Sequence, residues 1–324
     1  MLSTWLTRTA GLRVPLVNAP MTPAAGGLLA RAVSDAGGLG FVGIDSRDDV
    51  TSVREQVALA RAGRPDVPLG IGLIAWVLPS RLELLDLVLA LQPTFVSISF
   101  GDPAPYVDAL HRRGILVASQ VQDRESALAA SAAGVDAIVS QGTEAGGHTG
   151  AVGTLTLLQI VLESVTQPVL AAGGIATARG VAAVLGAGAE GVWVGTPFLL
   201  AAESRVADAT RSLIARSREG DTVLTHVFDV AQGLAWPARF PGRAIANEFT
   251  AEWHGREDEL SSNFGALERF ARAKREGDVT LSNVYAGQSI GLLANVEPAA
   301  AIVARLMDGA EELLRLRPAS ILSD

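Results

Sequence analysis

Short apolar runs rich in β-branched residues alternate from Val14 to Trp193 with longer segments rich in alanine and leucine. The first kind is typical of buried parallel strands, and the second is typical of the helices that cover them. The pattern predicts eight strands, at residues 14–19, 38–42, 69–73, 95–99, 116–119, 137–139, 169–171 and 191–194. It also predicts helices near residues 26–35, 48–62, 79–91, 103–112, 123–133, 154–164 and 177–185.

Residues at the ends of these segments mark the element boundaries. Asp48, Asp123 and Thr177 can each accept a backbone N–H at the start of a helix, and Gly37 can adopt the left-handed backbone that ends one. Eight strand–helix units favour closure into a barrel over an open sheet, because closure leaves no edge strand exposed. The predicted fold is therefore a (β/α)8 TIM barrel of the α/β class.

The alternation stops after Leu200, where residues 203–286 become richer in charge and contain scattered aromatic side chains. We interpret this segment as a mostly helical insertion, and the apolar spacing within 297–317 predicts the outer helix of the last unit. The predicted domains are a barrel formed by 1–202 and 287–324 and an insertion between strand eight and its helix. That place is the catalytic rim of a barrel, so we expect a lid or substrate domain. Its aromatic residues either shape the substrate pocket or form a small core of their own: Trp236, Phe240, Phe249 and Trp253.

Charge and composition narrow the class of partner. The 324 residues include 26 Lys and Arg against 34 Asp and Glu, a net charge of −8. Without a basic run, this balance argues against nucleic acid or an anionic membrane as the main partner. No apolar stretch approaches the roughly 20 residues of a membrane span, and the start lacks the pattern of a secretory signal. We expect a cytoplasmic protein that acts on a small molecule, with a homodimer left open.

The absence of cysteine removes thiol nucleophiles, disulfides, iron–sulfur clusters and cysteine-ligated zinc. The 4 histidines, His111, His148, His226 and His254, lack the sequence spacing of a helix-borne metal site. We therefore expect no metal, and redox chemistry must come from an organic cofactor.

Glycine-rich turns follow the seventh and eighth predicted strands, at Gly173-Gly174 and Gly195-Thr196. Loops at this place in a barrel frequently bind phosphate, because glycine lets backbone N–H groups approach an oxyanion. Tight turns without a ligand are the alternative, and the position within the barrel favours phosphate. Because no lysine stands at a strand end and no metal cluster is evident, we expect a phosphorylated cofactor such as FMN.

The loop after the sixth predicted strand, residues 140–150, places glycines around His148 and Glu144. His148 can take or give a proton near neutral pH, and flanking glycines leave its ring accessible. A histidine satisfied by a backbone partner is the alternative, but a loop at the catalytic rim favours catalysis. Glu144 receives no catalytic role, since it can equally orient a backbone turn or contribute only surface charge.

Several segments resemble, in order and spacing, the nitronate monooxygenase family, also called the 2-nitropropane dioxygenases. They are Asn18-Ala19-Pro20-Met21, the loop from Gln141 to His148, Ala171 to Ile175, Gly195 to Phe198, and Ala286 to Ser289. The resemblance covers nearly the whole chain, and the Glu-Ala-Gly-Gly-His string is specific to this family and its relatives. It implies a (β/α)8 barrel that binds FMN non-covalently, with the flavin ring over the C-terminal ends of the strands.

The resemblance also implies roles for individual residues. Those that would line or border the flavin ring are Ala19, Pro20, Met21, Gln141, Gly142, Gly146 and Gly147, with Gln288 and Ser289 closing over it. Those that would hold the phosphate are Gly173, Gly174, Gly195 and Thr196. Gly72 lies at a flavin contact where family members often have asparagine, so that contact is missing or replaced, and Gln120 could supply a hydrogen bond instead. His148 would take the α-proton of a neutral nitroalkane or steer an already anionic nitronate.

The activity implied is FMN-dependent nitronate monooxygenation, in which alkyl nitronates, with nitroalkanes as further candidates, react with O2 to give carbonyl compounds and nitrite. The alternative is an NAD(P)H-dependent FMN reductase of the enoyl-acyl-carrier-protein reductase or quinone reductase type, because such enzymes share the Gly-Gly-His loop. A barrel that only binds FMN or another phosphorylated ligand is a third interpretation.

Overall fold

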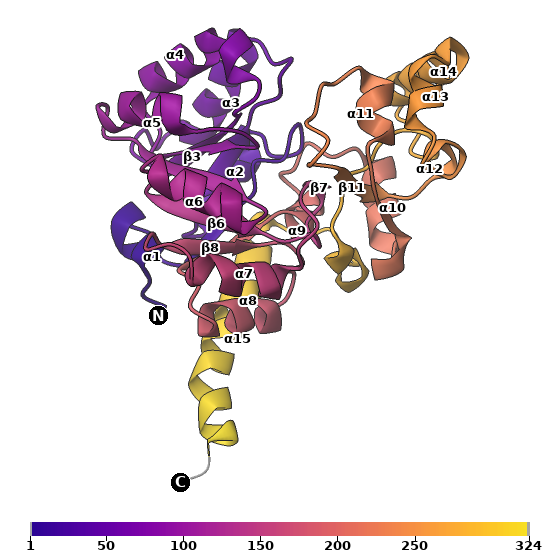
Figure 1. Ribbon diagram of the computed structural model, residues 1–324. Helices are drawn as coiled ribbons and strands as arrows, with labels where there is room; N and C mark the ends of the chain where they lie inside the picture. Colours follow the sequence, from indigo (N-terminus) through magenta and orange to yellow (C-terminus); the bar gives the residue numbers. More distant parts are fainter. Residues whose placement is uncertain (1, 323–324) are drawn as a thin grey trace.

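Eight parallel strands form a barrel in the computed structural model, which describes residues 2–322 (Figure 1). The strands are paired in the order β1-β9-β8-β6-β5-β4-β3-β2. β1 and β2 close the barrel through one parallel bridge, Val17 to Leu39, and a 2.8 Å hydrogen bond from the Leu39 N–H to the Leu16 carbonyl. The Asn18 side chain adds two hydrogen bonds to the Phe41 backbone, at 2.8 Å and 2.9 Å. The bounds are β1 Leu16–Asn18, β2 Gly40–Gly43, β3 Leu69–Ile74, β4 Phe95–Ser99, β5 Leu116–Val121, β6 Ala137–Gln141, β8 Val169–Ala172 and β9 Gly191–Val194. The predicted fold class is confirmed.

Helices follow the strands and cover the outside of the barrel. They are α2 Gly27–Asp35, α3 Val50–Arg61, α4 Leu82–Leu91 with the short η1 Leu78–Ser80 before it, α5 Ala104–His111, α6 Arg124–Ala132, α7 Thr154–Leu162, α8 Ala178–Gly186 and α15 Ala299–Ile321. Asp123 and Thr177 cap α6 and α8 as predicted, and Gly37 after α2 has a φ of +97°. The predicted cap Asp48 is wrong: Asp49 caps α3, while the Asp48 carboxylate accepts the backbone N–H of Asp45.

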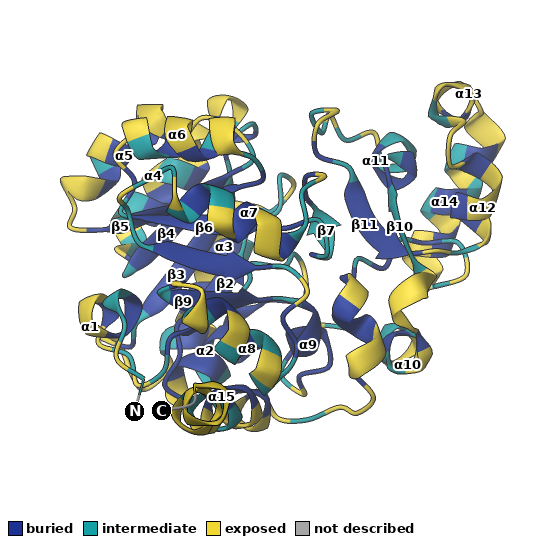
Figure 2. Ribbon diagram, turned by 60° about the horizontal axis from the view of Figure 1, so that its bottom comes forward, coloured by how far each residue is buried: buried dark blue, intermediate teal, exposed yellow. Residues whose placement is uncertain are grey.

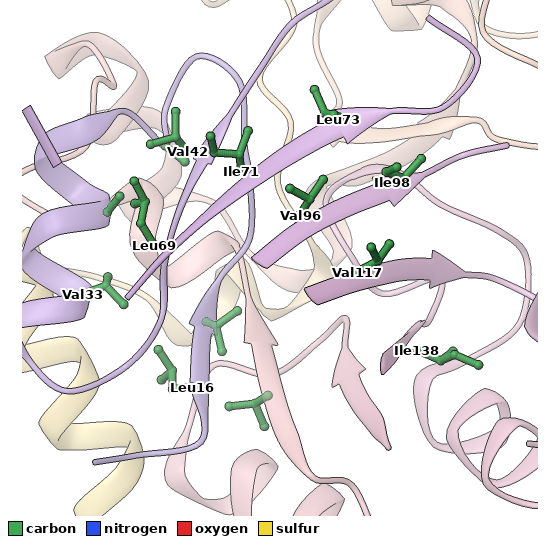
Figure 3. Packing of buried hydrophobic residues seen from close by; sticks show 14 of the residues in the cluster. Leu16, Val33, Val42, Leu69, Ile71, Leu73, Val96, Ile98, Val117 and Ile138 are labelled. Carbon is green, nitrogen blue, oxygen red and sulfur yellow. The ribbon is translucent and has the colours of Figure 1, made fainter. Parts of the chain in front are cut away.

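Apolar side chains fill the barrel in two layers. The outer layer lies between strands and helices, where residues such as Val42, Ile71 and Val96 pack in Figure 3. The inner layer is closed at the N-terminal end by α1 (Trp5–Ala10), a helix that the sequence analysis did not predict. Its Leu6 is fully buried, and Trp5 meets Phe95 edge-on at 6.1 Å between ring centroids. α1 therefore closes the N-terminal end of the barrel, and a ligand can enter only from the C-terminal ends of the strands.

The inserted segment, residues 203–286, is mostly helical but also contains two strands that the sequence analysis missed. Its elements are α10 Asp208–Arg216, η2 Glu219–Asp221, β10 Thr222–Thr225, α11 Val227–Gln232, β11 Gly242–Ile245, α12 Glu248–Trp253, α13 Glu257–Ser261 and α14 Phe264–Glu276, placed between α9 Thr196–Leu199 and η3 Gln288–Leu292. β11 pairs on one side with β10 and on the other with β7 (Gly147–His148), a strand in the loop after β6. Figure 2 shows β7 between the barrel and the inserted strands.

A small core holds the inserted segment together. Phe228, Phe249 and Phe270 are at most 1% exposed and lie in ring contact, and Trp253 packs in the same cluster. Phe249 and Trp253 therefore belong to the core of the segment, whereas Trp236 contacts the barrel. Among the helices of residues 2–322, none has the length and apolar character needed to cross a bilayer.

Replacing Leu6 by alanine tests the barrel plug. Because Leu6 is fully buried in the inner layer, Leu6→Ala should lower the free energy of unfolding by about 2–5 kcal/mol, as measured by urea denaturation. Leu316, which is 63% exposed, provides the matched control, and Leu316→Ala should change stability by less than about 0.5 kcal/mol. Equal losses in the two variants would show that α1 does not support the core.

Candidate active site

A cavity of about 510 Å³ opens at the C-terminal ends of the barrel strands. Its floor and sides come from the barrel, and its remaining wall comes from the inserted segment, which supplies Trp236, Lys274 and Tyr285. This volume lies within the range typical of small-molecule sites. The two parts of the chain thus build one pocket at the rim that the sequence predicted.

Most of the predicted site residues line this cavity. They are Ala19, Pro20, Met21, Gly72, Gln120, Gln141, Gly146, Gly147, His148, Gly173, Gly174, Gly195, Thr196 and Ser289. Gly142 and Gln288 are not among the described residues that line it. A Cβ atom on Gly142 would lie 2.3 Å from the Cα of Thr154, so this glycine lets the loop pack against the start of α7. Gln288 is exposed, and its backbone N–H donates to the Glu144 carbonyl at 2.9 Å.

Two glycines explain why the Glu-Ala-Gly-Gly-His loop and the late Ala-Gly-Gln-Ser segment occur together. A Cβ on Gly146 would lie 2.6 Å from the carbonyl carbon of Ala286, and one on Gly287 would lie 2.5 Å from the Glu144 carbonyl oxygen. Backbone therefore packs directly on backbone, which only glycine allows at these positions. The contact brings Ser289 to the edge of the same cavity.

Hydrogen bonds from buried amides hold the loop after β6. Gln122 donates its side-chain N–H to the Gln141 side-chain oxygen at 2.8 Å, and the Gln141 amide donates to the His148 carbonyl at 3.1 Å. The Thr149 hydroxyl donates to the Gly142 carbonyl at 3.0 Å. Gln141 therefore lines the cavity while its amide fixes the backbone of His148.

Glu144 caps a helix, which resolves the alternatives that its sequence context left open. Its Oε2 accepts the backbone N–H of Thr154 at 2.8 Å and the Thr154 hydroxyl at 2.7 Å. Thr154 is the first residue of α7, and the preceding Gly153 has no side chain to cap that helix. The Glu144 carboxylate thus acts as the capping acceptor of α7 and links the loop after β6 to that helix.

Arg243 on β11 joins the inserted segment to the same loop. Its Nε donates to the Thr143 carbonyl at 2.7 Å, and its Nη1 donates to the Thr222 hydroxyl at 3.2 Å. Burial lowers the pKa of Arg243, and the charge of Glu144 opposes that effect. The bond to the Thr143 carbonyl joins the inserted segment to the loop, and breaking it would take that partner from a buried guanidinium and a backbone carbonyl, so separating the two segments is costly.

His148 is bound to a carboxylate from the inserted segment. Its Nε2 lies 2.9 Å from Asp229 Oδ1, and the two side chains are only 9% and 5% exposed. The second oxygen of Asp229 lies 3.3 Å from His226 Nδ1. The partner of the His148 ring is therefore a carboxylate and not a backbone group, and His226 contacts the same carboxylate.

Aromatic rings surround His148. Trp236 stacks on the imidazole with 3.4 Å between ring centroids and a 7° interplanar angle. Trp236 also meets Trp76 at 5.4 Å and Phe100 at 5.1 Å. Phe100 has a φ of +65°, a strained conformation for an aromatic residue, and such strain is concentrated at functional sites. The rings form a wall that keeps water from one face of the histidine.

Burial raises the pKa of Tyr285, and the negative charge of Asp229 raises it further. The phenol of Tyr285, whose ring lies 5.6 Å from that of His148, is therefore protonated at neutral pH. Three cationic side chains also line the cavity: Arg47 from the barrel, Arg205, and Lys274 from α14. Burial lowers the pKa of Lys274, and the positive charge of Arg47 lowers it further.

Sequence reasoning missed Asp229 and Arg243, and it left Trp236 between a pocket residue and a core residue of the insertion. Asp229 lies 81 residues from His148 along the chain, and neither residue stands in a motif that links them. The only available signal was the group of aromatic residues in a segment predicted to cover the rim, which pointed to Trp236 without placing it.

A family model described as "Nitronate monooxygenase" matches residues 79–309. The chain belongs to the nitronate monooxygenase family. It is 32% identical over 343 aligned positions to the nitronate monooxygenase of Neurospora crassa, covering 93% of this chain and 90% of that protein. It is 30% identical to a probable nitronate monooxygenase of Staphylococcus saprophyticus, covering 97% of this chain and 99% of that one.

Two solved structures superpose on nearly the whole length of this nitronate monooxygenase family member. FabK from Thermotoga maritima superposes with a TM-score of 0.87 at 30% identity, covering 99% of this chain and 100% of that one. Nitroalkane oxidase from Streptomyces ansochromogenes superposes with a TM-score of 0.80 at 29% identity, covering 97% and 99%. The predicted family is confirmed, and so is the prediction of a flavin-dependent oxidoreductase.

Replacing Glu144 by alanine tests its capping role. Glu144→Ala leaves the Thr154 N–H without its acceptor, so we expect a loss of about 1–2 kcal/mol in unfolding free energy, measured by urea denaturation. Glu312→Ala on the exposed face of α15 is the matched control and should leave stability unchanged. An unchanged stability for Glu144→Ala would contradict the capping role.

Proposed function

We propose that this protein is an FMN-dependent nitronate monooxygenase, which oxidises alkyl nitronates with O2 to carbonyl compounds and nitrite. The observation that carries the proposal is His148, held by Asp229 in the wall of a cavity at the barrel rim. Membership of the nitronate monooxygenase family supports the same reaction. Its small partners are then the nitronate and O2, while a homodimer stays a prediction.

Two features of the cavity fit a flavin: the space left by its glycines, and the buried indole donors Trp76 Nε1 and Trp193 Nε1. A Cβ on Gly147 would have no atom within 4 Å, and one on Gly195 would meet only Met21 and Ala19 at 3.4 Å and 3.6 Å. These glycines leave space along the cavity wall. The indole Nε1 of Trp193, a cavity-lining residue, is buried and has no hydrogen-bond partner among the described residues. A buried donor without a partner is costly, and an acceptor on a bound ligand would remove that cost.

The phosphate of FMN would lie at the turns after β8 and β9. Gly173 and Gly174 have φ values of +100° and +70°, a backbone geometry that glycine adopts readily, and without side chains they let the turn approach a phosphate closely. Thr196 Oγ1 accepts the Gly287 N–H at 3.0 Å, so its own hydrogen is available to a phosphate oxygen. Ala19, Pro20 and Met21, with Gly146, would border the ring, as the family resemblance implies.

FMN supplies the electron acceptor when it is bound, and the protein supplies the proton chemistry. His148 takes the α-proton of a neutral nitroalkane, which leaves the nitronate, and Asp229 stabilises the imidazolium that forms. With a preformed nitronate no proton has to be removed, and His148 steers the anion instead. The aromatic wall around Trp236 excludes water, which strengthens these interactions. Lys274 and Arg205 add positive charge that favours entry of an anionic substrate, whereas the charge of Arg47 is offset by Asp45 at 3.1 Å.

One comparison favours a second candidate, an NAD(P)H-dependent FMN reductase. The superposition on FabK is at least as close as that on nitroalkane oxidase, with TM-scores of 0.87 and 0.80. The nitronate reaction is preferred because the family model and the curated relatives carry that name. The two reactions use the same scaffold, so a direct assay must separate them.

Purified protein should contain FMN, seen in its visible spectrum, and should consume O2 and release nitrite with a panel of alkyl nitronates. Anaerobic mixing with NADH or NADPH should leave the flavin oxidised on the timescale of turnover. Rapid bleaching by either nucleotide, with no nitrite formed, would establish the reductase instead. Flavin binding without turnover in either assay would indicate a barrel that only binds its ligand.

Replacing His148 by asparagine tests its role as the base. His148→Asn should lower kcat/KM for neutral nitroalkanes by about 10²–10⁴-fold, the usual contribution of a general base, and should affect preformed nitronates much less. His111→Asn, on the outside of the barrel, is the control and should leave both rates unchanged. Equal losses with both substrate forms would show that His148 is not the base.

A further inference from the structure

We infer that Asp229 is a positioning residue that holds neutral His148 in the tautomer protonated on Nε2, so that Nδ1 exchanges the proton with the substrate. The inference rests on the proposed function, in which His148 removes the substrate α-proton. It adds a role for the inserted segment, because Asp229 lies on α11 outside the barrel strands and loops.

The contact between the two side chains determines the tautomer. A carboxylate only accepts hydrogen bonds, so a 2.9 Å contact between Asp229 Oδ1 and His148 Nε2 requires a hydrogen on that nitrogen. In a neutral imidazole, the other nitrogen is then an acceptor. Nδ1 of His148 has no hydrogen-bond partner among residues 2–322, and it is not among their fully buried unpartnered atoms. Nδ1 is therefore the nitrogen left to act as a base.

Rotation of the ring is opposed on several sides. Trp236 covers one face at 3.4 Å, and the Tyr285 ring lies 5.6 Å away. The backbone of His148 is paired with Gly242 on β11, where a Cβ would lie only 3.5 Å from His148 Nε2. A ring flip would break the bond to Asp229 and disturb the stack on Trp236. The geometry thus presents one nitrogen to the inserted segment and the other to the cavity.

His226 fixes the orientation of Asp229 itself. The Nδ1 of His226 lies 3.3 Å from Asp229 Oδ2, and its Nε2 lies 3.0 Å from the Ala238 carbonyl. Both neighbours are acceptors, so both hydrogen bonds form together only when His226 carries two ring protons. Asp229 is 5% exposed, and the paired histidines satisfy both of its oxygens away from water.

The Asp229–His148 hydrogen bond would act at one step of the reaction, the transfer of the substrate α-proton to His148. When Nδ1 takes the substrate proton, the substrate C–H bond breaks, its electron pair stays on the nitronate, and His148 becomes an imidazolium. The buried Asp229 carboxylate stabilises that charge through the Nε2 hydrogen bond. A preformed nitronate needs no such proton transfer. Loss of Asp229 should therefore affect the neutral substrate more than the anion.

The test uses the full chain loaded with FMN and ¹⁵N-labelled at histidine. At a pH where His148 is neutral, NMR should show the wild-type ring protonated on Nε2. Asp229→Asn should shift the population toward the Nδ1–H tautomer, because its amide can donate to Nε2. The same variant should lose about 10²–10⁴-fold in kcat/KM with a neutral nitroalkane, as expected for a mispositioned base, and less than tenfold with the nitronate.

Two control variants distinguish a positioning role of Asp229 from a general effect of substitution on folding. Asp258→Asn on the exposed part of α13 should leave tautomer and rates unchanged, and Asp229→Glu should recover part of the nitroalkane rate by restoring the carboxylate. A wild-type ring protonated on Nδ1 overturns the inference, and this measurement needs no variant to fold. An unchanged tautomer and nitroalkane rate in Asp229→Asn overturns it as well. If the wild type oxidises neither substrate, the proposed function fails, while the NMR result still decides the role of Asp229.

Discussion

The antiparallel pairing of β7 with β11 determines how the active site is assembled. β7 is only two residues long, Gly147 and His148, and its partners are Gly242 and Arg243 of the inserted segment. Without that pairing, His148 would stand on a glycine-rich loop with many conformations open to it. With it, the backbone of the histidine is part of a small sheet, and Arg243 reinforces the contact by donating to Thr143. Asp229 and Trp236 are brought to the histidine ring by the same segment.

The barrel side of the site depends on backbone proximity. Gly146 and Gly287 let two loops that are far apart in the sequence touch, and Glu144 fastens one of those loops to the start of α7. These loops approach the turns that would hold a phosphate, since Gly287 also donates to Thr196. A side chain added at either glycine would push the loops apart and disturb the ring and phosphate regions together. The family motif is thus a packing motif as much as a chemical one.

The barrel could be predicted because its strands and helices carry local signals: β-branched runs, capping residues such as Asp123 and glycines after helices. His148 and Glu144 stood out for the same reason, since both lie in one unusual loop. β11 gave no such signal, because Gly-Arg-Ala-Ile lacks an alternating pattern and its partners lie elsewhere in the chain. The 81-residue separation of Asp229 from His148 is likewise invisible to any local pattern, as tertiary contacts alone bring them together.

The barrel and the inserted segment contribute different parts of the site, which offers an explanation of how enzymes with this scaffold can catalyse different reactions. The residues that would hold FMN lie on barrel turns and loops, whereas most of the groups that surround the histidine ring come from the inserted segment. A change in the inserted segment can therefore alter which proton is moved, and for which substrate, without changing the flavin turns. The structural likeness to both FabK and nitroalkane oxidase is consistent with such a division, because it spans nearly the whole chain in each case. On this argument, the side chains facing His148 are better indicators of the reaction than the Gly-Gly-His loop itself.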